Sequence, residues 1–181
     1  MKRFLSLFLA FLIYYPFPSL AVEQPRPEQQ ASLTKSEDAV GKKIGDYRLI
    51  DQDGREFNTS EFISRPFVVS FIYTSCTYIC GTITQSLSNV VKERPGGFGK
   101  DFNILTVSFN PESDTPARLK EFGSGFTKEF TKWRFATGSK ETIARMTQDF
   151  GFFYKKEGNH FQHMNMVSVI GAKWNIITHV Y

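Results

Sequence analysis

The sequence is poor in cysteine and histidine, and its charges are not concentrated in any one region. Only two cysteines and three histidines occur among 181 residues, and the formal net charge is +4 at pH 7. Acidic and basic residues are interspersed, without the clustered basic stripe that nucleic-acid binding requires. No internal repeat is present either. We therefore expect one ordinary folded domain that has no nucleic-acid partner.

The first 21 residues have the pattern of a secretory signal peptide. Lys2 and Arg3 precede the apolar run FLSLFLAFLIYY, and the small residues Ser19 and Ala21 suit a cleavage site. The run is too short to span a bilayer comfortably, so an uncleaved leader that anchors the protein is the alternative. No cysteine lies near the cut, which argues against a lipoprotein. Export would place the cysteines in an oxidising compartment, where free thiols need a reducing partner or a bound metal.

Two further regions follow the leader. Residues 22–43 are polar and contain Pro25 and Pro27, a composition that predicts a flexible tether. Residues 44–181 contain enough apolar side chains to bury the core of a single domain. We therefore divide the chain into a leader (1–21), a tether (22–43) and one folded domain (44–181).

The folded domain is organised around residues 67–80, FVVSFIYTSCTYIC. The continuous apolar, β-branched and aromatic run at its start predicts a strand buried on both faces. Cys76 and Cys80 come directly after that strand, and residues 81–93 have helical spacing. The cysteine pair is therefore predicted to lie where a central strand turns into a helix, at the sheet edge where reactive groups collect.

The other elements alternate between strand and helix. Asp53-Gly54 predicts a hairpin turn within residues 46–58. Asp114 or Thr115 is predicted to cap a helix whose first turn contains Pro116. The further predicted elements are strands at 102–109 and 133–137, a helix from Ser139 through Phe150, and strands within 152–181 that turn at Gly171-Ala172.

This order of elements predicts an α/β fold. Strands that alternate with helices, with a cysteine pair after the first core strand, are typical of a thioredoxin-like three-layer domain. An N-terminal and a C-terminal β-hairpin flank the alternating part. Because Tyr181 follows a strand directly, we expect the final covering helix of such a fold to be absent.

The spacing of the cysteines permits two kinds of chemistry. If both lie in the first helical turn, their Cβ atoms are about 5–6 Å apart on one face. They can then share a metal ion or close a disulfide, and the N–H groups at a helix N-terminus lower the pKa of a cysteine there. A purely stabilising disulfide is the alternative, although so short a loop would constrain the unfolded chain very little.

The histidines discriminate between these chemistries. His163 immediately precedes the apolar strand MNMVSVI, and a loop at that place can reach the sheet edge that carries the cysteines. Two thiolates and one imidazole form a three-coordinate set that suits copper, as Cu(I) or Cu(II). Zinc would require a fourth ligand, which His160 could supply. The alternative for any single histidine is a surface or core position without a ligand role.

The absence of late prolines argues against an ordinary thiol enzyme. Thioredoxin-type enzymes place a cis-proline against the cysteine pair, but the last proline here is Pro116, and His163 and Met164 occupy that neighbourhood. The pair is also one residue wider than Cys-x-x-Cys. Thr74 lies two residues before Cys76, whereas peroxiredoxins have threonine three residues before. An exported thiol-disulfide oxidoreductase that acts on cysteines of a partner protein remains the alternative to a metal carrier.

Three segments, FIYTSCTYIC, FNPESDTPARLKEF and HMNMVSVIGAKW, resemble the Sco/SenC family. The resemblance extends over residues 44–181 and implies a copper-binding, thioredoxin-like metallochaperone, a metal carrier more than an enzyme. It implies that Cys76, Cys80 and His163 are the copper ligands. It further implies a periplasmic protein, free or anchored to the inner membrane, which supports assembly of the binuclear copper site of cytochrome c oxidase. The implied partners are the oxidase subunit that receives copper and a thiol reductant.

The chain departs from the usual family pattern around these ligands. Thr77 and Gly81 follow the two cysteines, where the family usually has proline. Gln162 precedes the histidine in place of aspartate, so it can hydrogen-bond but adds no negative charge. Met164 and Met166 are potential soft ligands, but their alternation in a strand predicts core packing.

Overall fold

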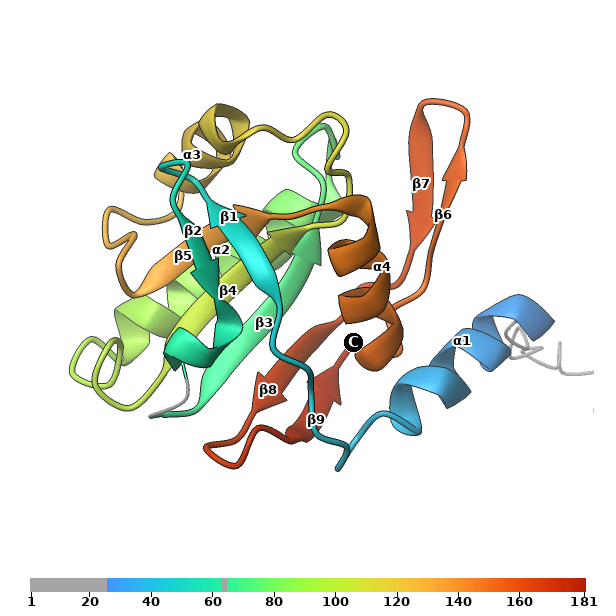
Figure 1. Ribbon diagram of the computed structural model, residues 1–181, viewed down its shortest axis with the longest axis horizontal. Helices are drawn as coiled ribbons and strands as arrows, with labels where there is room; N and C mark the ends of the chain where they lie inside the picture. Colours follow the sequence, from blue (N-terminus) through green and yellow to red (C-terminus); the bar gives the residue numbers. More distant parts are fainter. Residues whose placement is uncertain (1–25, 63–64) are drawn as a thin grey trace, which may run out of the picture.

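The computed structural model describes residues 26–62 and 65–181. Its centre is a seven-stranded sheet in the order β2-β1-β5-β4-β3-β8-β9, and a separate two-stranded ribbon, β6-β7, stands beside it (Figure 1). The elements are α1 (Pro27–Glu37), β1 (Arg48–Asp51), β2 (Glu56–Asn58), the 3₁₀ turn η1 (Thr59–Phe62), β3 (Phe67–Ile72), α2 (Ile79–Glu93), β4 (Asn103–Ser108), α3 (Pro116–Ser124), β5 (Trp133–Thr137), α4 (Lys140–Asp149), β6 (Tyr154–Glu157), β7 (His160–His163), β8 (Val167–Ile170) and β9 (Ile176–Val180).

The predicted buried strand is β3, and it lies at the middle of the sheet. It pairs in parallel with β4 and antiparallel with β8. Five of its six residues are buried, as expected for a strand that is covered on both faces. One buried face carries a polar contact chain, in which the Ser70 hydroxyl lies 2.9 Å from Thr106 Oγ1 and Trp133 Nε1 donates to the same oxygen over 2.9 Å. The side-chain polar atoms of these three residues therefore all have hydrogen-bond partners although they are buried away from water.

The helices cover the two faces of the sheet. The Ser88 hydroxyl of α2 donates to the carbonyl of Phe126, so α2 packs against the segment that follows α3. On the other face, Phe71 of β3 packs edge-on against Phe150 at the end of α4, with ring centroids 5.4 Å apart. In Figure 1, α4 lies in front of the sheet and α2 behind it. The prediction of a three-layer, thioredoxin-like α/β fold is therefore confirmed.

Both predicted terminal hairpins are present. Strands β1 and β2 pair antiparallel around a turn in which Gly54 has φ +79°, a conformation that favours glycine. Strands β8 and β9 pair antiparallel at the edge of the sheet. The β6-β7 ribbon was foreseen only as strand content, and it projects away from the sheet in Figure 1.

Helix α1 lies inside the region that the sequence predicts to be a tether. Pro27 takes the first helical position, where its missing N–H costs nothing. The end of the helix is held by the body of the domain: the Ser36 hydroxyl lies 2.6 Å from the Tyr181 hydroxyl. Residues 27–37 therefore have regular structure where a flexible segment was expected. A local composition rule could not foresee contacts with the opposite end of the chain, and the domain boundaries stay a prediction.

The predicted signal peptide lies outside the described residues. Among the helices in ranges 26–62 and 65–181, none has the length and apolar character needed to cross a membrane. The described residues therefore do not test the prediction that any membrane association depends on the N-terminal segment.

Candidate metal centre

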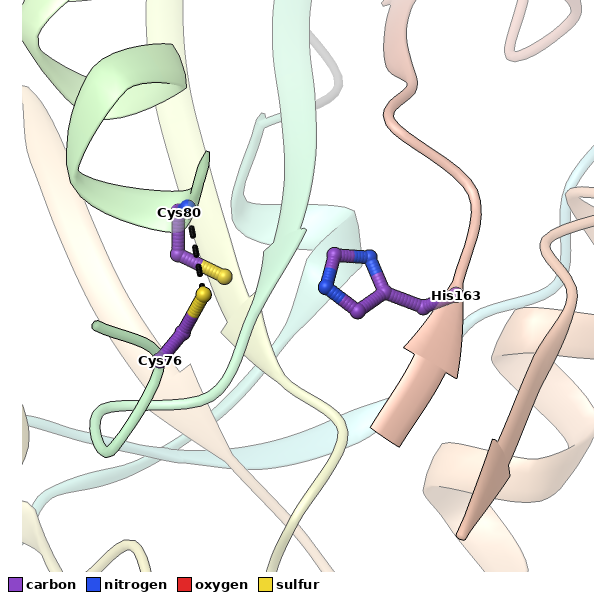
Figure 2. A group of neighbouring side chains, drawn as sticks. All are labelled: Cys76, Cys80 and His163. Carbon is purple, nitrogen blue, oxygen red and sulfur yellow. Dashed lines mark hydrogen bonds between the residues drawn. The ribbon is translucent and has the colours of Figure 1, made fainter. Parts of the chain in front are cut away.

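Cys76 lies in the turn between β3 and α2, three residues before the helix begins. Its backbone N–H donates to the carbonyl of Tyr73 over 3.1 Å, which closes the turn. Cys80 is the second residue of α2 and is completely buried. Of the two cysteines, only Cys80 lies in the first turn of α2, so the condition under which both would share that turn is not met. The turn nevertheless brings the two sulfurs together (Figure 2).

The two thiols have different environments. Burial alone raises the pKa of Cys76, but hydrogen bonds from the backbone N–H groups of Cys80 and Tyr78 outweigh it and lower the pKa below its ordinary value. The Cys80 N–H lies 3.5 Å from the Cys76 sulfur. Burial raises the pKa of Cys80, and the negative charge of Cys76 raises it further. The helix N-terminus therefore favours the Cys76 thiolate, while Cys80 stays protonated unless a positive charge arrives.

His163 reaches the cysteines from the β6-β7 ribbon, at the last residue of β7. Its Nδ1 lies 2.9 Å from the backbone carbonyl of Met164. When Nδ1 donates its proton there, Nε2 carries a free lone pair, which is the tautomer that a metal requires. Figure 2 shows the ring with its outer nitrogen directed toward the two sulfurs.

A cluster of aromatic rings surrounds the His163 imidazole. The ring centroids of Phe109, Tyr73 and Phe152 lie 5.4, 5.7 and 6.3 Å from that of His163. Phe161, two residues earlier on β7, packs edge-on against Phe109 at 5.3 Å. These contacts hold the end of the ribbon on the sheet and fix the orientation of the imidazole. The sequence contains 19 phenylalanines, but their number alone does not predict this location.

The three predicted ligands therefore come together. The two sulfur atoms and a ring nitrogen of His163 all lie within 4.8 Å of one another. Three donor atoms arranged in a plane around one ion, each about 2.3 Å from it, lie about 4 Å from one another. An adjustment of at most about 1 Å would therefore bring all three onto a common ion. Two thiols and one imidazole are a soft donor set of the kind that copper favours.

The other residues considered from the sequence lie elsewhere. His160 is exposed at the start of β7, pairs with Glu157 across the ribbon, and does not belong to the group. His179 lies in β9, where its Nδ1 is 2.8 Å from the Ser168 hydroxyl. Met166 is buried in the core and Met164 packs against it, as predicted.

The helix cap is formed by Thr115. Its side chain accepts a hydrogen bond from the backbone N–H of Arg118, so Asp114 does not cap α3. The Asp114 carboxylate instead turns toward the segment that precedes Cys76. Sequence reasoning missed this role, because Thr74 lies 40 positions away in the chain.

The fold and the site together define a thioredoxin-like protein with a cysteine, cysteine and histidine cluster at one edge of its sheet. The family model described as SCO1/SenC matches residues 35–181. The chain belongs to the SCO1/SenC family.

Individual relatives agree with this assignment. The SCO2-like protein of Rickettsia felis is 28% identical over 169 residues, which cover 90% of this chain and 80% of the relative. The solved structure of BsSco, described as a member of the Sco family of cytochrome c oxidase assembly proteins with a disulfide switch, is 25% identical with a TM-score of 0.67 and covers 77% of this chain and 82% of its own. The structure of Arabidopsis thaliana ScoI with copper bound has the same fold, with 22% identity, a TM-score of 0.68 and coverage of 78% and 87%.

Proposed function

We propose that this protein binds copper through Cys76, Cys80 and His163 and carries it to a partner protein. The observation that carries the proposal is the convergence of two sulfurs and one imidazole nitrogen within 4.8 Å. Membership of the SCO1/SenC family and the shared fold of a ScoI protein solved with copper bound support it.

Copper fits this donor set better than zinc does. Thiolates select soft ions such as Cu(I), and an imidazole suits either oxidation state of copper. Structural zinc sites almost always have four protein ligands, and His160 does not join the group. The buried Cys80 thiol, whose pKa is raised by burial, loses its proton only when a cation compensates its charge, so binding releases protons.

The recipient would approach from the side of Cys76. Cys76 is partly exposed, whereas Cys80 is fully buried, so an incoming thiol meets Cys76 first. We propose transfer by ligand exchange with cysteines of the recipient. The recipient we favour is the cytochrome c oxidase subunit that holds the binuclear copper site, since BsSco is described as an oxidase assembly protein. This role places the domain in the periplasm, free or anchored by its N-terminal segment, with a thiol reductant to keep the pair reduced.

A specific observation also favours a second function. The lowered pKa of Cys76 beside a second thiol is the arrangement of an exported thiol-disulfide oxidoreductase acting on a partner's cysteines. Against it, no cis peptide bond occurs in the ranges that the structure describes, so the cis-proline platform of such enzymes has no counterpart there.

Copper loading of the reduced protein separates the two functions. We would compare wild type with Cys80→Ser, His163→Ala and the matched control His160→Ala, which removes an exposed histidine from the same ribbon. A copper carrier loses affinity in the first two variants, keeps it in the third, and reduces insulin disulfides poorly. Wild-type copper affinity in His163→Ala, together with strong insulin reduction, would refute the carrier and support the oxidoreductase.

A further inference from the structure

Asp114 is a buried carboxylate close to the metal centre that the proposed function does not use. It lies in the loop between β4 and α3 and is 1% exposed. A buried negative charge is costly unless hydrogen bonds compensate it. Because Thr115 caps the following helix, capping does not account for the burial of Asp114.

Three donors surround this carboxylate. Oδ2 accepts from the backbone N–H of Thr74 over 2.9 Å and from the Ser108 hydroxyl over 2.5 Å. Oδ1 accepts from the Thr74 hydroxyl over 2.6 Å. Two of the three contacts therefore go to a single residue, Thr74, which belongs to the chain segment after β3.

Thr74 belongs to the turn of residues 73–76 that carries Cys76, which we call the cysteine turn. It follows Tyr73, whose carbonyl accepts from the N–H of Cys76, and it precedes Cys76 by two positions. A two-point attachment fixes both the position and the orientation of that peptide. Asp114 thus connects the segment that follows β3 to the end of β4, next to the turn that carries the partly exposed Cys76.

We propose that Asp114 is a positioning residue for the metal centre: through Thr74, its carboxylate holds Cys76 at the place where its sulfur can share an ion with Cys80 and His163. The ligand role is part of the proposed function, on which this inference rests. Hydrogen-bonded groups behind metal ligands commonly set ligand geometry, and their loss costs 10–100-fold in metal affinity.

The second anchor of the carboxylate provides a matched comparison. Ser108 donates to the same Oδ2 but lies on β4, and its hydroxyl in turn accepts from the backbone N–H of Asn110. Thr74→Val and Ser108→Ala each remove one hydroxyl from the carboxylate. Only Thr74→Val loosens the cysteine turn. If the role of Asp114 is purely structural, the two substitutions should therefore have equal effects on the metal centre. If Asp114 positions Cys76, Thr74→Val should have the larger effect.

Asparagine is the conservative replacement at position 114. With its carbonyl oxygen in the place of Oδ2, it accepts from the Thr74 N–H and from Ser108, and its NH₂ group donates to the Thr74 hydroxyl. Asp114→Asn therefore keeps the attachment and removes the charge, whereas Asp114→Ala removes both. Comparison of the two variants separates position from charge.

The test uses two readouts on the same purified variants. The first is Cu(I) affinity, measured by competition with a chromophoric Cu(I) chelator. The second needs no metal: the equilibrium constant for forming the Cys76–Cys80 disulfide with a glutathione buffer, which depends on how closely the turn holds the two thiols. Thermal unfolding reports stability and shows which variants are folded.

We expect Asp114→Ala to bind Cu(I) about 10–100-fold more weakly and to form the disulfide less readily. Asp114→Asn should bind Cu(I) no more weakly than wild type. Thr74→Val should lower both the Cu(I) affinity and the equilibrium constant for disulfide formation, but by less than Asp114→Ala does. Ser108→Ala should change neither quantity. Equal effects of Thr74→Val and Ser108→Ala, or unchanged readouts in a folded Asp114→Ala, would overturn the inference. If wild type binds no Cu(I) but the disulfide readout follows this order, the proposed function fails and the positioning role stands.

Discussion

Replacing Phe109 with alanine should weaken both the fold and the metal centre. Its ring is 2% exposed and lies 5.3 to 5.4 Å, centroid to centroid, from the rings of Tyr73, Phe161 and His163. Removing it opens a cavity between the end of β3 and the ribbon that carries His163. The imidazole then loses the surface that fixes its orientation toward the sulfurs.

The size of both effects follows from this packing. A buried Phe→Ala change costs about 3–5 kcal/mol of unfolding free energy. In a domain of this size each kcal/mol lowers Tm by about 2–4 °C, so we expect a decrease of about 6–20 °C. Because His163 loses its support, Cu(I) affinity should also fall, by about 10–100-fold as for other groups that orient a metal ligand.

The matched control is Phe135→Ala. Phe135 is fully buried on β5 and packs against Phe122 of α3, away from the ribbon. It should lose similar stability in urea unfolding but keep wild-type Cu(I) affinity in the chelator competition. If both variants lose stability and neither loses affinity, the aromatic cluster does not position His163 and our reasoning is refuted.

Three further predictions concern single residues. Iodoacetamide should alkylate Cys76 well before the buried Cys80, with a rate midpoint below pH 9.0 because hydrogen bonds outweigh burial and lower the pKa of Cys76. Burial lowers the pKa of His179 below its ordinary 6.5, so the unfolded chain takes up the proton first, and stability should fall as pH drops through about 6.5. Gly151→Ala should detach α1, because its Cβ would lie 2.5 Å from the carbonyl oxygen of Lys35. Hydrogen exchange over residues 27–37 measures that detachment.

Each of these has its own control. Alkylation of Cys80 at the rate of Cys76 would contradict the assigned environments. For His179, thermal unfolding of His179→Gln should show a weaker acid dependence than wild type, and an identical dependence would exclude the residue as its source. Gly158→Ala has a similar positive φ, +60°, but open space around its Cβ. Gly158→Ala should leave the amides of α1 protected from hydrogen exchange. If residues 27–37 exchange as fast in Gly158→Ala as in Gly151→Ala, backbone strain and not the clash with Lys35 would explain the detachment.

The sequence was most informative where a local pattern decides the structure. The apolar run at 67–72 became β3, and Asp53-Gly54 became the turn of the first hairpin. The convergence of His163 on the cysteines was also foreseen, because sheet topology brings the start of one strand to the end of another. These inferences needed only periodicity, turn chemistry and the order of elements.

What the sequence did not reveal depends on contacts between distant residues. Helix α1 is held through Ser36 and Tyr181, which are 145 positions apart. The attachment of Thr74 by Asp114 spans 40 positions. Local propensity cannot specify such pairs, since the partner that decides the conformation is elsewhere in the chain.

X-ray absorption at the copper edge of the reduced, Cu(I)-loaded protein tests the central claim most directly. We expect two sulfur ligands and one nitrogen ligand in wild type, and loss of the nitrogen in His163→Ala with both sulfurs retained. A wild-type spectrum with sulfur ligands alone, or a nitrogen that persists in His163→Ala, would contradict the assignment of this imidazole to the copper site.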